Sequence, residues 1–343
     1  MTLSKLRIGF VGAGDNTRKR HLPGFRAIPG VELAVVVNRS RESSERVARE
    51  FGIARCADHW REVVASPDVD AVCIGTWPYL HAEIAVAALQ AGKHVLTEAR
   101  MSRTVAEAEL MVAAAQAAPT RVAQIVPAPM SLAYDATVAE LLSSGVLGDI
   151  REVCVTQTGG QYCDSRAPLS WRQDTELSGF NVLTLGITYE IILRWLGWDA
   201  RVVAADEAIY TPERIDGAGT RRPVGIPDSI SVLGRYDGGA RLVMHCSGVE
   251  GGEGRNEIRL NGSRASLRVE VATGTLTLAP VGQPLRTVSV PAVADGGWRV
   301  EADFVESIRD GAPVRLTNFA TGLRIMRFTE AARRAAMESA QPR

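Results

Sequence analysis

Two glycines near the start of the chain, Gly12 and Gly14, follow a short apolar run at 6–11 and have the clearest chemical meaning in the sequence. A glycine pair between an apolar strand and a helix can bind the pyrophosphate of a dinucleotide. The first glycine permits the tight turn, and the second lets the phosphates approach N–H groups at the helix N-terminus. The third glycine of the pattern is replaced by Thr17, so an ordinary glycine turn stays an alternative.

The residues after the next apolar run, 31–37, bear on which dinucleotide would bind. In an NAD-binding unit, an acidic side chain at this place accepts a hydrogen bond from the ribose 2′-hydroxyl. This chain has the neutral Asn38 and then Arg39, whose guanidinium suits a 2′-phosphate. The sequence therefore favours NADP, with NAD as the alternative. If no cofactor binds here, Arg39 is a solvated side chain at the start of a helix.

Alternating strand and helix patterns in the first half of the chain position these residues. The strands are apolar runs of the kind buried in parallel sheets, and glycine or proline ends the helices between them. This order predicts a doubly wound parallel sheet with right-handed crossovers, which strengthens the dinucleotide interpretation. The expected strands are 6–11, 31–37, 70–75, 93–98 and 121–126, and the expected helices are 41–51, 81–91 and 104–118.

The composition narrows the class of protein. The 343 residues are enough for about two domains, and 46% of them are hydrophobic while 23% are charged. Lysine plus arginine equals aspartate plus glutamate, so we expect no nucleic-acid partner, and without a long apolar run we expect no membrane partner. Five scattered cysteines and five dispersed histidines predict a cytoplasmic protein with neither disulfides nor a metal site.

Two segments later in the first half carry a family resemblance. Residues 76–81 read TWPYLH, and residues 92–98 read GKHVLTE. In this order they resemble the Gfo/Idh/MocA family, whose pattern is Thr-Pro-x-x-x-His, then Gly-Lys-His-Val and Glu-Lys-Pro. The loop proline is one place late here, with Trp77 in its position. The resemblance implies an NAD(P)-dependent oxidoreductase acting on a sugar, a polyol or a related carbonyl compound. It also implies a homodimer or homotetramer formed through an open-faced sheet in a second domain.

Three positions depart from the family pattern at residues that move protons. Glu-Lys-Pro reads Glu98-Ala99-Arg100, so the family's lysine is an alanine here. On a helix of the second half, the match places Thr184 and Thr188 where the family has an aspartate and its catalytic histidine. These threonines are four residues apart and share one helix face, but their hydroxyls do not titrate near neutral pH. We therefore expect a retained scaffold with altered acid–base chemistry.

The resemblance and the chemistry of the side chains together give a set of candidate site residues. Proton transfer is expected from Glu98, Asp174, Tyr162 or a water held by Thr184 and Thr188. Substrate contacts are expected from Arg100, Arg172, Asn181 and Tyr189. Cofactor contacts are expected from Gly12, Gly14, Asp15, Asn16, Asn38, Arg39, Ser40, Thr76, Trp77, Pro78, His81 and Glu98.

Two of these candidates have structural alternatives. Asp174 would serve equally well as a surface or capping carboxylate. Tyr189 follows Thr188 directly and points about 100° away from the threonine face of the helix, which favours packing.

The second half of the chain has the pattern of a different domain. Short strands rich in Val, Ile and Thr are separated by glycine turns, which predicts a largely antiparallel sheet. Residues 210–227, rich in Gly, Pro and Arg, are expected to form a long loop. The expected strands are 152–158, 230–236, 241–246, 257–261, 266–271 and 275–279. The expected domains are a Rossmann domain at 1–124, an α+β substrate and oligomerisation domain at 125–315, and a C-terminal helix at 316–343 that returns to the first domain.

Three functions remain open on this basis. The first is hydride transfer between a nicotinamide and a sugar-like or polyol-like substrate, with non-standard acid–base residues. The second is a redox-neutral lyase, epimerase or hydrolase on a sugar-like substrate, which the missing lysine and histidine motivate. The third is a non-catalytic NADP-binding protein.

Overall fold

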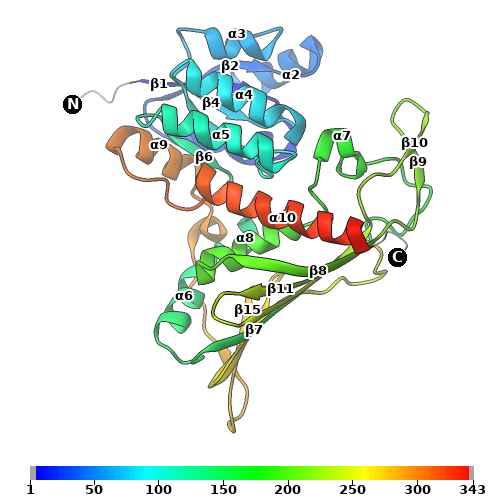
Figure 1. Cartoon of the computed structure of the whole chain (residues 1–343). Coiled ribbons are helices and arrows are strands. Elements are labelled where there is room, and N and C mark those ends of the chain that lie inside the picture. Colours follow the sequence, from blue (N-terminus) through cyan, green and yellow to red (C-terminus); the bar gives the residue numbers. More distant parts are fainter. Residues whose placement is uncertain (1–4, 340–343) are drawn as a thin grey trace. The chain divides into compact units, whose positions relative to one another are not determined.

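A computed structural model describes residues 5–339, which fold into two compact units (Figure 1). The first unit extends to Pro127 and resumes over Arg299–Met326. The second unit comprises Ala128–Trp298 and resumes at Arg327. Each unit is therefore assembled from two separate stretches of the sequence.

The first unit is built on a parallel sheet with the strand order β3-β2-β1-β4-β5-β6. This order confirms the expected doubly wound fold, in which the chain reverses direction across the sheet beside β1. All four side chains of β4 are buried, as parallel strands covered on both faces require. The strands are β1 (Leu6–Val11), β2 (Val31–Val37), β3 (Arg55–Cys56), β4 (Ala71–Ile74), β5 (His94–Thr97) and β6 (Ala123–Ile125).

Helix α2 (Arg41–Phe51) of the first unit begins and ends at residues with recognisable capping chemistry. The Ser40 side chain accepts the Ser43 N–H at the start of α2, and Gly52 ends that helix with a φ of 66°. A single π-helical segment, η1, leads directly into α1. The helical segments are η1 (Thr17–His21), α1 (Leu22–Ala27), α2 (Arg41–Phe51), α3 (Trp60–Ala65), α4 (Pro78–Gln90), α5 (Val105–Ala117), α9 (Val300–Asp310) and the first part of α10 (Phe319–Ser339).

Helix α9 belongs to the first unit, whereas the expected second domain ran to residue 315. Phe304 on α9 packs edge-on against Phe25 of α1 at a centroid separation of 6.1 Å. Phe25 in turn contacts Phe10 of β1 at 6.0 Å. Burying these rings fixes α9 against the Rossmann sheet, so the segment that returns to the first unit begins at Arg299 rather than at 316.

The second unit is built on a mixed sheet with the strand order β16-β15-β14-β13-β7-β12-β11-β8. Only the β7–β12 pair among these described neighbours is parallel, which confirms the largely antiparallel expectation. Burial alternates along β11, so one face of the sheet is covered and the other is open. The strands are β7 (Ile150–Thr158), β8 (Ala200–Ala208), β11 (Ser229–Tyr236), β12 (Arg241–Ser247), β13 (Asn256–Gly262), β14 (Ala265–Glu270), β15 (Thr275–Pro280) and β16 (Arg286–Val288).

Helices α6 (Asp135–Ser143) and α8 (Leu185–Leu196) of the second unit are joined by a partly buried hydrogen bond. The indole N–H of Trp195 on α8 donates to the Asp135 carboxylate on α6 at 2.6 Å. Within residues 5–339, no helix combines the length and the apolar character needed to cross a bilayer. The helical segments are η2 (Pro129–Ser131), α6 (Asp135–Ser143), η3 (Trp171–Gln173), α7 (Thr175–Ser178), α8 (Leu185–Leu196), η4 (Ala294–Gly297) and the remainder of α10.

The expected loop at 210–227 contains a short hairpin of β9 (Glu213–Ile215) and β10 (Arg221–Pro223) (Figure 1). Arg214 anchors it, because its buried guanidinium donates to the carbonyl oxygens of Tyr162, Asp164 and Ala167. The prediction of a loop without strands was therefore wrong, because the Arg214 hydrogen bonds hold a hairpin in this segment. The hairpin also fixes the backbone around Tyr162.

Candidate functional site

The glycine turn after β1 keeps its shape although its third glycine is missing. Gly12 has a φ of +83°, and a Cβ there would lie 2.8 Å from the Thr76 backbone nitrogen. Thr17 is buried, and its hydroxyl donates to the Gly12 carbonyl oxygen at 3.3 Å. The space for that hydroxyl comes from Gly75, where a Cβ would stand 2.2 Å from the Thr17 oxygen. Thr17 is thus part of the turn and does not disrupt it.

Gly14 has a different reason to be glycine. It is exposed, and a Cβ built on it would meet the Gly75 carbonyl oxygen at 3.7 Å, an ordinary contact distance. The protein itself therefore leaves room for a side chain at this position. The phosphates of a bound dinucleotide would come close to this backbone and fill that space. The turn therefore fits the pyrophosphate of a dinucleotide.

The residues that follow β2 are arranged around the same turn. The Asn38 side-chain oxygen accepts the Ala13 N–H at 2.6 Å, and its amide nitrogen donates to the Ser43 hydroxyl at 3.1 Å. Ser40 caps α2. The guanidinium carbon of the exposed Arg39 lies 4.8 Å from the centre of the Trp77 ring, a cation–π contact. Asn38 therefore stabilises the turn, while Arg39 remains at the surface beside an aromatic side chain.

His81 ties two loops together at the ends of β4 and β5. Its ring nitrogens lie 2.9 Å from the Thr76 carbonyl oxygen and 2.8 Å from the Arg100 carbonyl oxygen. Burial disfavours the charged imidazole and lowers the pKa of His81 below its ordinary value. Pro78 is the first residue of α4 and sets the start of that helix. His81 thus positions the backbone of both loops from a fully buried site.

Glu98 follows β5 directly and is held by two side chains. Its Oε1 accepts a hydrogen bond from Asn16 at 2.6 Å and lies 3.0 Å from His21 Nε2. Burial raises the pKa of the Glu98 carboxyl, but the His21 contacts and the Asn16 hydrogen bond outweigh it and leave that pKa below its ordinary value. Asp15, by contrast, is exposed and pairs with Lys19 at 2.9 Å.

The candidate cofactor residues of the first unit gather at one edge of its sheet. They follow the carboxyl ends of β1, β2, β4 and β5, where parallel sheets bind ligands. Sequence reasoning did not single out His21, although it touches Glu98. Its only sequence signal is its place in the helix that follows the glycine turn.

The two threonines of the second unit lie at the start of α8. Thr184 precedes the helix, and its hydroxyl donates to the Gln157 side-chain oxygen on β7. Thr188 is fully buried, and its hydroxyl oxygen has no hydrogen-bond partner among residues 5–339. Neither side chain titrates, so α8 supplies no acid or base at the positions where the family has aspartate and histidine.

Asp174 and Arg172 lie just before α7. One Asp174 oxygen accepts the Glu176 N–H at 2.8 Å and so caps the helix, and the other lies 3.6 Å from the Arg222 guanidinium. Arg172 is exposed and stacks over the Trp171 ring at 4.3 Å. The capping contact is the structural alternative noted for Asp174 in the sequence.

Three further candidates in the second unit are buried. Tyr162 is 9% exposed, and Asn181 donates to the Ser178 carbonyl oxygen at 2.7 Å. Tyr189 stacks on Phe328 at a centroid separation of 3.7 Å, and its hydroxyl accepts the Ala200 N–H at 2.8 Å. The packing expected for Tyr189 is therefore what its side chain does.

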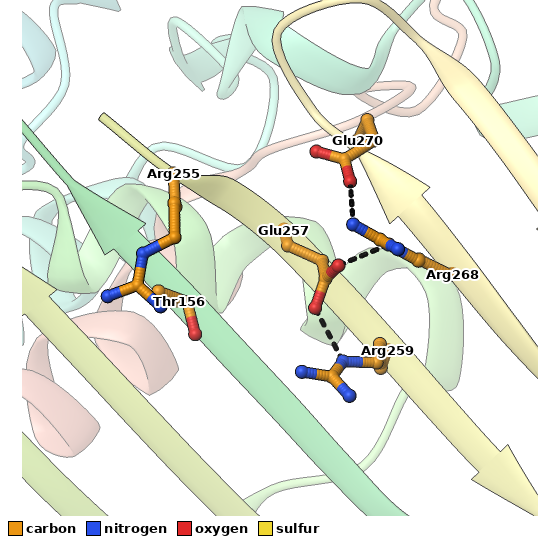
Figure 2. A pocket seen from close by; sticks show the side chains of 6 residues that line it. All are labelled: Thr156, Arg255, Glu257, Arg259, Arg268 and Glu270. Carbon is orange, nitrogen blue, oxygen red and sulfur yellow. Dashed lines mark hydrogen bonds and ion pairs between the residues drawn. The ribbon is translucent and has the colours of Figure 1, made fainter. Parts of the chain in front are cut away.

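A cavity of about 270 Å³ lies on the sheet of the second unit, and none of the candidate residues lines it (Figure 2). Glu257 accepts from both Arg259 and Arg268, and Arg268 also pairs with Glu270 at 2.5 Å. All these side chains come from β13 and β14 on the open face of the sheet. The lining residues are Thr156, Arg255, Glu257, Arg259, Arg268 and Glu270.

Comparison with known proteins identifies the class to which this fold and turn belong. Residues 6–125 match the model of an oxidoreductase family with an NAD-binding Rossmann fold. Residues 136–268 match the model of the Gfo/Idh/MocA C-terminal domain. Both models describe the same family and together they span most of the chain. The protein is therefore a member of the Gfo/Idh/MocA family of oxidoreductases.

Named relatives of the chain include dehydrogenases. Levoglucosan dehydrogenase of Pseudarthrobacter phenanthrenivorans is 26% identical, over 96% of this chain and 95% of its own length. Rabbit (Oryctolagus cuniculus) trans-1,2-dihydrobenzene-1,2-diol dehydrogenase is 29% identical over 65% of this chain and 64% of its own length.

Solved structures share the whole fold. An oxidoreductase domain protein from Kribbella flavida has a TM-score of 0.87 at 25% identity, with 98% of both chains covered. A levoglucosan dehydrogenase in complex with NADH and L-sorbose has a TM-score of 0.87 at 23% identity, with 97% of both chains covered.

Proposed function

We propose that the protein transfers hydride between a nicotinamide dinucleotide and a carbon of a sugar, a polyol or a related carbonyl compound. The observation that carries the proposal is Gly14, which the packing of the protein leaves open although its position in the turn is that of the phosphate-binding glycine. The names of the relatives, levoglucosan dehydrogenase among them, support a sugar-like substrate. The bound nicotinamide would supply or take the hydride, and the residues of this chain would bind, orient and handle the proton.

The first experiment is a fluorescence titration of the purified protein with NADPH and NADH. Binding of either cofactor is expected, followed by a substrate-dependent absorbance change with a panel of sugars, polyols and their carbonyl relatives. The matched control is Gly14→Ala, which should fold normally and lose cofactor binding. Absence of binding by the folded wild-type protein would contradict the proposal.

The proposed cofactor is NADP rather than NAD. Asn38 is neutral, and its side-chain oxygen already accepts the Ala13 N–H, so it replaces the acidic acceptor of an NAD site poorly. Arg39 is exposed on the rim of the same edge, where its guanidinium could bind a 2′-phosphate while it remains over the Trp77 ring. A lower Kd for NADPH than for NADH is the expected result, and equal constants would contradict the preference.

The proposed proton-handling residues remain those suggested by the sequence: Glu98, Asp174, Thr184, Thr188 and Tyr162. Thr184 and Thr188 would hold a water or a substrate oxygen through their hydroxyls, since they cannot titrate. Arg100, Arg172, Asn181 and Tyr189 remain the proposed substrate contacts. Substituting Asp174 by Asn separates its two roles, because an amide oxygen can still cap α7 but cannot accept a proton. Loss of turnover in a normally stable Asp174→Asn variant would support the proton role.

A second function is favoured by the side chains at three positions. Ala99, Thr184 and Thr188 all lack a titrating group where the family has one. A redox-neutral reaction on a sugar-like substrate, with the cofactor unchanged overall, would need other acid–base groups than the family's dehydrogenases use. The loss of the titrating groups at these three positions agrees with such a change. Product formation without net change in the 340 nm absorbance of the cofactor would favour this function over the first.

Assembly and location are the remaining parts of the proposal. We expect a cytoplasmic homodimer or homotetramer, with subunits meeting on the open face of the second unit's sheet. The charged side chains around the cavity in Figure 2, Glu257 and Arg268 among them, could pair across such an interface. Light scattering at 50 mM and 1 M salt measures the assembly, and a monomer at both concentrations would contradict it.

The cysteines are all unpaired, which suits a reducing compartment.

A further inference from the structure

A buried imidazole lies between two carboxylates in the first unit. His21 is 0% exposed, and its Nδ1 lies 2.5 Å from Glu301 Oε1 on α9. Its Nε2 lies 3.0 Å from Glu98 Oε1. Glu301 is itself 4% exposed, so both flanking carboxylates are largely withdrawn from water. An imidazolium with both N–H groups donating satisfies this geometry, and it pairs the buried charges.

The backbone around Glu301 leaves space for this arrangement. A Cβ on Gly24 of α1 would lie 2.8 Å from Glu301 Oε2 and 2.9 Å from its carboxyl carbon. The carboxylate therefore packs directly against the helix that follows His21. The Phe25–Phe304 contact joins the same two helices and keeps Glu301 at that distance.

Charge in the surrounding elements favours a protonated His21. Burial lowers the pKa of the imidazole, but hydrogen bonds and charge from Glu301 and Glu98 outweigh it and raise the pKa to about 9. Cys73 on β4 faces the same carboxylates, and burial with their charge raises the pKa of its thiol, so it remains neutral. His81 on α4 also acts on Glu98, and Asn16 donates to it.

Glu98 is the member of the group that a ligand can reach. Its Oε1 is occupied by His21 and Asn16, and within residues 5–339 no hydrogen bond involves Oε2. The side chain keeps 17% of its surface exposed, at the carboxyl end of β5. Parallel sheets of this kind bind dinucleotides at this edge, so Oε2 is the carboxylate atom available to the nicotinamide half of a bound cofactor.

We propose that the buried Glu301–His21 pair positions Glu98, fixing Oε1 and presenting Oε2 as a permanent carboxylate to the nicotinamide end of the cofactor. This rests on the proposed cofactor binding and assigns His21 and Glu301 as positioning residues. In this role Glu98 is a hydrogen-bond acceptor and a negative charge beside the nicotinamide, and this replaces the proton-handling role considered for it above. Two carboxylates and one imidazolium leave a net charge of −1, which favours the cationic oxidised cofactor.

The first test needs no ligand. The chain has five histidines, and His21→Gln identifies the His21 resonance by its loss from an NMR titration of the imidazoles. In the wild-type protein His21 should titrate near pH 9. Glu301→Gln should lower that value by about one pH unit or more, because it removes one of the two flanking charges. The control Glu306→Gln, on the same helix and paired with Arg299, should leave it unchanged.

The second test connects the pair to the cofactor. By linkage, NADP⁺ binding should raise the His21 pKa, because the cofactor binds more tightly when the protonated imidazole holds Glu98 in place. The affinity for NADP⁺ should fall about tenfold as pH rises past His21 deprotonation, because Glu98 loses its charged donor. In Glu301→Gln that fall should occur at lower pH, and in Glu306→Gln at the wild-type pH.

The outcomes separate this proposal from the proposed function. If the wild-type protein binds no dinucleotide, the proposed function fails, and the ligand-free titration still decides whether the buried pair exists. A His21 that titrates below pH 7 overturns the proposal. So does an NADP⁺ affinity that stays constant or rises with pH, since the carboxylate would then need no positioning by the imidazolium.

Discussion

The two glycines of the turn should respond in opposite ways to the same small substitution. Gly12→Ala places a methyl group 2.8 Å from backbone and side-chain atoms of Thr76, at a φ of +83°. The unfavourable φ costs about 1–2 kcal/mol and the overpacking about 1–3 kcal/mol, so the free energy of unfolding should fall by about 3 kcal/mol. Gly14→Ala meets only the Gly75 carbonyl oxygen at 3.7 Å, and a compatible Gly→Ala change stabilises by about 0.4–1 kcal/mol.

Urea unfolding of the ligand-free variants measures the first effect, and NADPH fluorescence titration measures the second. We expect Gly14→Ala to have a urea midpoint slightly above that of the wild type and to bind NADPH at least tenfold more weakly, because its methyl group fills the phosphate position. The ligand-free Gly12→Ala variant should already have a lower urea midpoint than the wild-type protein. A Gly14→Ala protein that binds NADPH like the wild type would refute the inference that the open glycine is kept for a ligand.

Three further predictions follow from the first unit. Arg39→Ala should weaken NADPH binding about tenfold more than NADH binding, whereas Arg41→Ala, whose guanidinium already pairs with Glu45 and Asp58, should change neither; both are measured by fluorescence titration. The pKa of His21, raised from 6.5 to about 9, corresponds to about 3 kcal/mol of stability that is fully present below pH 6.5 and is lost as pH rises through 9. Urea midpoints between pH 6 and 10 should fall for the wild type and stay flatter for His21→Gln. Gly24→Ala should displace the Glu301 carboxylate, lower the free energy of unfolding measured in urea by about 1–3 kcal/mol and reduce the His21 pKa measured by NMR.

The sequence predicted the Rossmann elements closely because local signals and burial agree there. Residues 31–37 and 41–51 are a strand and a helix with the expected bounds. The apolar run of β2 requires burial, and Ser40 and Gly52 cap α2 by local chemistry. The edge strand β8 was missed, because only one of its nine residues is buried and the strand gives little apolar alternation.

The residues of the candidate site could be singled out from the sequence where one short segment carries them. The glycine turn, Asn38 and Glu98 were all singled out from their places after apolar strands. The His21–Glu301 contact was not, since it joins residues 280 positions apart and neither side chain belongs to a recognisable motif. Similarly, α9 joins the first unit through aromatic packing of Phe304, which no local pattern specifies.

The Asn38–Ala13 hydrogen bond has a consequence for the thermodynamics of binding. It joins the turn after β1 to the residue after β2, and Thr17 joins the same turn to its own start at Gly12. The turn is thus preorganised by contacts within the chain, and little conformational entropy remains to be lost when a dinucleotide arrives. Asn38→Ala would release the Ala13 N–H and loosen the turn. The affinity lost in that variant should therefore appear as a less favourable binding entropy in calorimetry, even though Asn38 need not touch the ligand.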